Sequence, residues 1–169
     1  MRMTLKKSGL LLFTLLLFLF SGCSSTPPIN RREKISKYFT MGEAVNSSIA
    51  KRRGIANVPN GREQMNIRYT AQRLDEVRRI LGRPVIVTSW YRSRQLNRAV
   101  GGSRTSAHRE GLAADIMLKK GRLGRLEFEK VRKRMSSYDQ LIYYPYRGHL
   151  HVGFRRNRFK DRREAMIKR

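Results

Sequence analysis

The stretch SAHREGLAADIML, residues 106–118, joins a polar loop to an apolar run. The run LAADIML, residues 112–118, predicts a buried strand that carries a single charged residue, Asp115. His108 lies in the loop before this strand, and Gly111 permits a tight turn between them. The stretch therefore predicts that one imidazole and one carboxylate lie close together at the edge of a sheet.

Strand and helix patterns alternate on both sides of this stretch. Apolar residues at helical spacing predict one main helix over residues 66–81, followed by Gly82, and a second over residues 126–135. Runs rich in β-branched and aromatic residues predict strands. Besides residues 112–118, these strands are PVIVTSWY at 84–91, YDQLIYY at 138–144 and HLHVGF at 149–154, the last two joined by a hairpin.

Shorter segments connect these elements. MGEAVNSSIAKRRG, residues 41–54, predicts one short helix, and residues 92–108 predict a loop with one helical turn at 95–99. KKGRLG, residues 119–124, predicts a turn. A chain of 169 residues has room for one domain with a substantial core. The order of elements predicts an α+β domain with a small, mainly antiparallel sheet and helices packed on it.

The chain contains only three histidines, and two of them lie close together in the sequence. His149 and His151 are two residues apart in a predicted strand, so both imidazoles point to the same face of the sheet. Two imidazoles and one carboxylate form a familiar catalytic zinc shell with a fourth position open to water. Such chemistry also needs a group that accepts and passes on a proton. A histidine taken alone is more often structural than a ligand, and the co-occurrence of these residues favours a metal site.

Four pieces of the chain carry a resemblance to a known family. They are YFTMGEAVNSSIAKRRGIANVP, VTSWYRSRQLNRAVGGSRTSAHREGLAADI, YDQLI and HLHVGF, and together they span most of residues 35–154. In these pieces the sequence resembles the zinc D-Ala-D-Ala carboxypeptidases and related L-alanyl-D-glutamate peptidases, which cut peptidoglycan stem peptides. The resemblance implies an α+β domain with an antiparallel sheet and a zinc ion in a cleft across it.

The resemblance also implies roles for individual residues. His108, Asp115 and His151 match the three ligands of Zn²⁺. Arg92 matches an arginine near the scissile carbonyl, where its planar fork would stabilise an oxyanion or hold a substrate carboxylate. Ser106 matches a serine beside the first ligand that orients this ligand or contacts the substrate.

The proton-transfer residue is less clear from the sequence. Some members of the family carry an acidic residue a few positions before the last ligand, and others carry a histidine two positions before it. No Asp or Glu lies between Gln140 and His151, so His149 is the predicted base, with Asp139 and Tyr144 as weaker candidates. Trp90 replaces the small residue expected before the Tyr-Arg pair, for which core packing is the favoured explanation over a role in the cleft.

The N-terminus predicts export. Basic residues precede an apolar run over residues 9–20, which is too short to span a bilayer and fits the apolar core of a signal peptide. The run ends in FSGC, which resembles a bacterial lipobox and predicts lipidation at Cys23; the alternative is an ordinary cleaved signal. The expected organisation is a lipoprotein signal peptide at 1–22, a tether at 23–34, a zinc peptidase domain at 35–155 and a basic tail at 156–169.

The net charge of +26 at pH 7 is extreme. In an exported protein such a charge favours contact with anionic membrane or wall polymers, and the export signal argues against nucleic acid as the partner. We therefore expect a monomeric lipoprotein, anchored in the cell envelope and facing the periplasm or wall, that hydrolyses peptidoglycan peptides. A non-catalytic wall-binding lipoprotein with the same fold is the alternative. The sequence does not identify the peptide bond that is cut.

Overall fold

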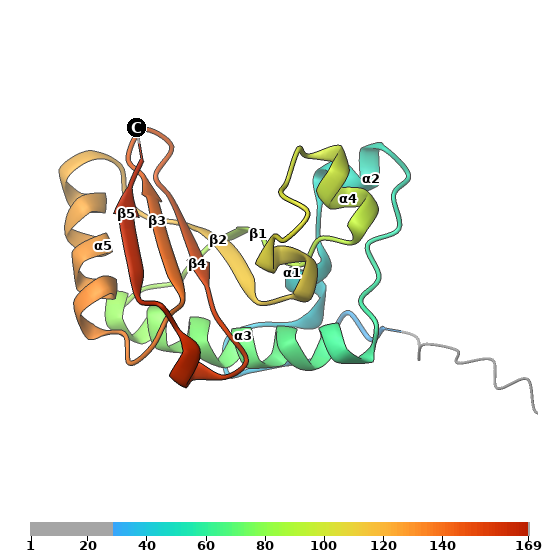
Figure 1. The fold of residues 1–169 in the computed structure, drawn as a ribbon, viewed down its shortest axis with the longest axis horizontal. Coiled ribbons are helices and arrows are strands. Elements are labelled where there is room, and N and C mark those ends of the chain that lie inside the picture. Colours follow the sequence, from blue (N-terminus) through green and yellow to red (C-terminus); the bar gives the residue numbers. More distant parts are fainter. Residues whose placement is uncertain (1–28, 169) are drawn as a thin grey trace, which may run out of the picture.

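A five-stranded sheet with the order β1-β2-β4-β3-β5 forms the centre of the molecule (Figure 1). The computed structural model describes residues 29–168. The pairings β1–β2, β2–β4 and β3–β4 are antiparallel, whereas β5 pairs in parallel with β3. The strands are β1 Val87–Ser89, β2 Ala113–Met117, β3 Gln140–Tyr144, β4 His149–Gly153 and β5 Glu164–Ile167.

The predicted α+β class with a mainly antiparallel sheet is confirmed, and the parallel pairing of β5 with β3 makes the sheet mixed. The parallel strand β5 comes from the basic segment after residue 155, which carries no apolar run long enough to predict a strand. A short 3₁₀ helix, η2 (Arg158–Lys160), precedes β5 and leads the chain back to the edge of the sheet.

Two long helices pack against the sheet. They are α3 (Gly61–Leu81), which runs below the strands in Figure 1, and α5 (Gly121–Arg134), which stands beside them. Shorter helices complete the fold at the other end of the molecule (Figure 1). The shorter ones are α1 (Met41–Val45), α2 (Ser48–Arg52), α4 (Arg94–Ala99) and the 3₁₀ helix η1 (Ala107–Glu110).

Helix α3 begins five residues before its predicted start. A capping box forms there, since the Asn60 side chain accepts from the Glu63 amide at 2.9 Å and Glu63 accepts from the Asn60 amide at 2.8 Å. The first turn carries no apolar periodicity, which is why the sequence pattern missed it. The helix ends where predicted, because Gly82 adopts the left-handed conformation with φ 66°.

Two other short elements differ from their predictions. The single helix predicted over residues 41–54 is two helices, because the side chain of Ser47 accepts from the Ala50 amide and starts α2 afresh. The turn predicted at residues 119–124 is largely helical, since α5 starts at Gly121. Gly124 lies so close to the Lys119 carbonyl and the Tyr143 hydroxyl that a Cβ there would collide with both. This glycine therefore serves close packing inside the helix.

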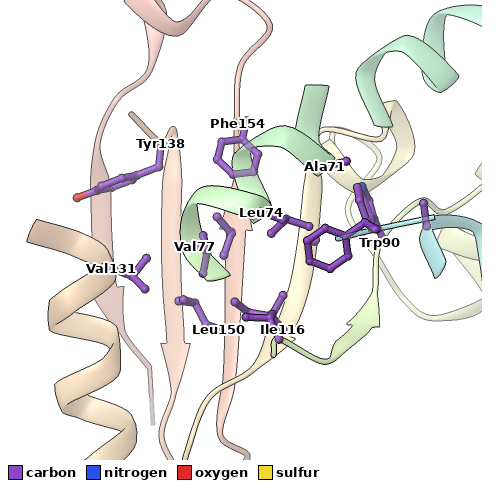
Figure 2. Packing of buried hydrophobic residues seen from close by; sticks show 14 of the residues in the cluster. Ala71, Leu74, Val77, Trp90, Ile116, Val131, Tyr138, Leu150 and Phe154 are labelled. Carbon is purple, nitrogen blue, oxygen red and sulfur yellow. The ribbon is translucent and has the colours of Figure 1, made fainter. Parts of the chain in front are cut away.

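Alternation along the strands gives the sheet two different faces. In β3 and β4, Leu141, Tyr143, Leu150 and Val152 point into the core. Figure 2 shows Leu150 in this core together with Val77 of α3 and Val131 of α5. The residues between them face the other way and remain partly exposed. That open face is where the functional side chains gather.

The chain before the domain core is also packed. Residues 29–34 fall within the segment expected as a tether, yet the Met41 amide donates to the Glu33 carbonyl at 2.9 Å and Arg68 pairs with the Glu33 carboxylate. The predicted signal peptide at 1–22 and the lipidation site Cys23 lie outside the described residues. Within residues 29–168, no helix has the length and apolar character needed to cross a membrane.

Candidate metal centre

Three predicted ligands from separate elements meet on the open face of the sheet. His108 lies on η1, Asp115 on β2 and His151 on β4, and one ligand atom from each lies within 4.8 Å of the others. Asp115 and His151 face each other directly in the β2–β4 register. The Asp115 Oδ1 atom is 2.9 Å from His151 Nδ1 and 3.2 Å from His108 Nε2. Neighbouring antiparallel strands and one adjacent loop therefore build the group.

A hydrogen bond on the side of the ring away from the other candidate ligands fixes the orientation of His108. Its Nδ1–H donates to the Trp90 carbonyl at 2.7 Å, which leaves the Nε2 lone pair directed at Asp115 and His151. Burial lowers the pKa of His108 below its ordinary value. The imidazole is therefore held neutral, which is the form that binds a metal ion.

Helix α3 holds the loop that carries His108. The Asn66 side chain donates to the Glu110 carbonyl and the Thr70 hydroxyl donates to the Gly111 carbonyl, both at 2.8 Å. Gly111 has φ 73°, so the tight turn expected from the sequence is present. Asn66 and Thr70 are buried polar residues four apart on the apolar face of α3. Two polar residues at this spacing on the apolar face of a helix are the signal in the sequence for this contact, which was not among the predictions.

Arg92 anchors the carboxylate of Asp115. Its Nη2 donates to Asp115 Oδ2 at 2.6 Å and its Nε donates to the Ser89 hydroxyl at 2.8 Å, so Oδ1 is left to face the two histidines. Burial alone would raise the pKa of Asp115, but the hydrogen bond from His151 holds it below its usual range. Arg92 was predicted to act on the substrate; in the structure its guanidinium engages the Asp115 carboxylate.

A cleft of about 800 Å³ opens over this group. Arg92, Ser106, His149 and Tyr144 all line it together with the three candidate ligands. His149 lies two residues before His151 on the same face of β4 and opposite Tyr144 of β3. Ser106 precedes η1, and its hydroxyl makes no capping hydrogen bond to that helix. The predicted base and the predicted substrate contact thus share one cleft.

Asp139 and Trp90, two other residues considered for the cleft, are engaged in contacts that stabilise the fold. Asp139 lines the cleft, but it is paired with Arg155 at 2.6 Å and Arg162 at 2.8 Å. Although burial opposes the shift, hydrogen bonds from Arg162 and Arg155 lower the pKa of Asp139, which makes it a poor proton acceptor. Trp90 is buried and packs edge-to-face on Phe39, with 5.9 Å between ring centroids, so core packing explains this residue (Figure 2).

The donor set fits a zinc ion. Two imidazole nitrogens and one carboxylate oxygen converge, the outward atoms of His108 and Asp115 are each held by a hydrogen bond, and the group borders an open cleft. Among residues 29–168 it is the one group of at least three such side chains that is close enough to hold a metal ion.

Comparison with known proteins agrees with this geometry. A family model described as Peptidase M15 matches residues 37–153, a range that contains the three candidate ligands and His149. A search of curated proteins finds no match to the chain.

Proposed function

Because the chain belongs to the peptidase M15 family and is therefore a metallopeptidase, we propose that it hydrolyses peptide bonds in peptidoglycan stem peptides while anchored to a membrane of the cell envelope. The observation that carries this proposal is the convergence of His108, Asp115 and His151 beside an open cleft. The alternative is a wall-binding lipoprotein that keeps the fold and the metal without activity, and hydrolysis of stem peptides separates the two.

The residues present assign the zinc ligands by atom. His108 would bind through Nε2, Asp115 through Oδ1 and His151 through Nδ1, since these are the atoms that face one another. A zinc ion held by three protein ligands supplies a Lewis acid that polarises a carbonyl and lowers the pKa of water.

The other side chains of the cleft handle protons and charge. His149 accepts a proton during the attack on the amide and returns it to the leaving amine. Arg92 keeps Asp115 in its ligating orientation and adds positive charge beside the carbonyl where negative charge develops. Ser106, at the start of the His108 loop, contacts the bound peptide.

Envelope location follows from the sequence features outside the described residues. The signal-like segment 1–22 would direct export, and a lipid on Cys23 would keep the enzyme beside the immobile wall polymer and so raise the rate of encounter. The large excess of Lys and Arg over Asp and Glu in the rest of the chain would add attraction to anionic lipids or wall polymers. The partners proposed are thus peptidoglycan peptides and the membrane surface, with no role for nucleic acid, and the protein acts as a monomer.

Mass analysis of muropeptides after incubation with the purified protein tests the function. Loss of one terminal alanine would identify a D-Ala-D-Ala carboxypeptidase, and scission within the stem would identify an endopeptidase. Cleavage should stop with a chelator and return with Zn²⁺. Intact muropeptides in the presence of zinc, together with retention of the protein on purified wall, would contradict the proposal and support the non-catalytic wall-binding alternative.

A further inference from the structure

Two arginines after β4 form one end of the cleft. Arg155 and Arg162 both line it, and both are bound to Asp139, which is buried at the start of β3. Arg162 donates to Asp139 from its backbone amide, its Nε and its Nη2, at 3.1, 3.1 and 2.8 Å. The Glu164 amide donates to the Asp139 carbonyl at 3.0 Å, which fastens β5 to the same place. Asp139 is therefore a fixed anchor for both guanidinium groups.

The guanidinium groups of Arg155 and Arg162 differ in which of their nitrogens remain without a partner among residues 29–168. Arg162 uses Nε and Nη2 on Asp139, and its Nη1 lies 3.3 Å from Glu164 Oε2. Arg155 uses only Nε on Asp139, at 2.6 Å, and within residues 29–168 its two terminal nitrogens have no hydrogen-bond partner. The Arg155 side chain is 44% exposed. Arg155 is thus held at Nε, while its two terminal nitrogens are free to bind a ligand at this end of the cleft.

A guanidinium group whose two terminal nitrogens are free binds carboxylates especially well. Its two parallel N–H groups bind a carboxylate in bidentate fashion. The Asp139 carboxylate accepts from both Arg155 and Arg162, so Arg155 shares this partner with a second cation. Gly153, which lies between His151 and Arg155 and lines the cleft, adds no side chain of its own there. Four positions separate Arg155 from His151, and extended chain of this length spans about 13 Å, which is the length of a short peptide segment.

From this arrangement we propose that Arg155 binds a carboxylate of the peptide substrate and so selects acidic stem peptides. The inference rests on the proposed function, since it names a group of that substrate. Arg155, Arg162 and β5 all lie beyond residues 37–153, the range that the family model matches. The segment after β4 therefore adds a recognition element to the zinc site, and β5 holds that element in place.

Pairs of stem peptides that differ by one carboxylate-to-carboxamide replacement test the proposal. For each pair, kcat/KM is measured on the zinc-loaded protein, and binding is measured by calorimetry. For the peptide whose carboxylate reaches Arg155, we expect the wild type to favour the acid over the amide about tenfold, mainly through KM, as a half-exposed charged hydrogen-bonding pair would give. Arg155→Gln should reduce this acid-to-amide ratio to about one.

The controls use neighbouring positions. Arg156→Gln changes an exposed arginine that does not line the cleft and should keep the wild-type ratio. Arg155→Lys keeps the charge without the fork and should give an intermediate ratio. Since Arg162 still pairs with Asp139, each variant is expected to unfold within a few degrees of the wild type.

The outcomes separate the two proposals. Hydrolysis with no acid preference in any pair, or a preference that Arg155→Gln retains, overturns the role of Arg155 and leaves the proposed function intact. Acid-selective binding that depends on Arg155, without hydrolysis, supports the carboxylate site and overturns the peptidase activity. Binding of neither peptide overturns both.

Discussion

Hydrogen bonds from outside the candidate metal group orient two of its three members. The Trp90 carbonyl holds Nδ1 of His108, and Arg92 holds Oδ2 of Asp115. Each contact leaves the opposite atom free to bind a metal ion, and each comes from the segment between residues 89 and 92. This short segment therefore determines the shape of the site although it supplies no ligand itself.

Separate substitutions of the two histidines of β4 should distinguish metal binding from proton transfer. His151→Ala removes a ligand, so we expect loss of bound zinc and of activity together. His149→Ala removes only the predicted base, so zinc should remain near one equivalent while kcat falls about 10²- to 10⁴-fold. Metal analysis by mass spectrometry and steady-state kinetics measure the two effects. Loss of zinc in both variants would show that His149 supports the metal site and is not merely the base.

The anchoring of Asp115 gives a second prediction. Arg92→Lys keeps the charge but cannot bond Ser89 and Asp115 with one planar group, so the carboxylate loses its fixed orientation. We expect zinc affinity to fall about 10- to 100-fold, as for other groups that support metal ligands. Competition with a fluorescent chelator measures this change. Arg98→Lys, at an exposed position of α4, is the control, and equal zinc affinity of the two variants would contradict the role of Arg92.

At the scale of single residues, the sequence predicted the candidate metal ligands better than the residues that hold these ligands in place. His108, Asp115 and His151 are few in kind and fall in motifs, so spacing and resemblance singled them out. The links from Asn66 and Thr70 to the His108 loop join residues more than 40 positions apart. Nothing in the local pattern pairs such residues, because the packing of α3 against η1 brings them together.

At the scale of elements, the position of η1 depends on its contact with α3. A Cβ on Gly111 would lie 2.7 Å from Ile67 Cγ1, and the residue has φ 73°. Gly111→Ala should therefore destabilise the protein by about 2–3 kcal/mol and weaken zinc binding, because both the backbone conformation and the packing are disturbed. Gly54→Ala is the matched control: it has φ 60° but open space around it, and should cost only about 1 kcal/mol without effect on zinc. Chemical denaturation and zinc titration test both variants, and equal effects would show that contact with α3 is unimportant.

An ion pair that joins the end of α3 to α5 makes stability depend on pH. Arg83 donates to both carboxylate oxygens of Glu127, at 2.7 and 2.6 Å. Burial alone would raise the pKa of Glu127, but Arg83 and the Lys119 amide hold it below its ordinary value of 4.5. The contribution is therefore complete above pH 4.5 and is lost as the pH falls through the lowered pKa.

The variant Glu127→Gln measures this contribution. At pH 7 it should be less stable than the wild type by about 1–2 kcal/mol, because a charge-assisted pair is lost. The difference in the free energy of unfolding should shrink as the pH falls below 4.5. A difference that is constant across this range would assign the loss to packing and not to charge.

The errors in predicting elements share a physical cause. Apolar periodicity reveals where a helix is buried, so it located the middle of α3 and of α5 but missed their polar first turns. It likewise could not show that the Ser47 cap divides residues 41–54 into two helices. Strand β5 contains only four residues and is partly exposed throughout most of its length. Its position depends on Asp139 and on the edge of β3, which are contacts that no local pattern contains.

At the scale of the whole molecule, the two faces of the sheet divide its tasks. The core-facing residues of β3 and β4 pack against α3 and α5 and stabilise the domain. The alternate residues, among them His149 and His151, form the floor of the cleft. A period of two was enough to predict this division for β4. The C-terminal segment then extends the cleft beyond the part of the chain that the family model matches, through Arg155 and Arg162.

The excess of positive charge predicts attraction to anionic membranes. Each cation near such a surface contributes about 1 kcal/mol, and the attraction is screened within about 10 Å at 0.1 M salt. The variant Cys23→Ser, which has no site for the proposed lipid, should therefore bind phosphatidylglycerol vesicles at least tenfold more tightly than phosphatidylcholine vesicles at low salt. Raising the salt concentration to about 0.5 M should remove most of this difference, because the Debye length shortens. Co-sedimentation measures the bound fraction. Equal binding to both lipids, or binding that does not respond to salt, would show that the charge serves solubility and that the lipid on Cys23 alone would have to hold the enzyme at the membrane.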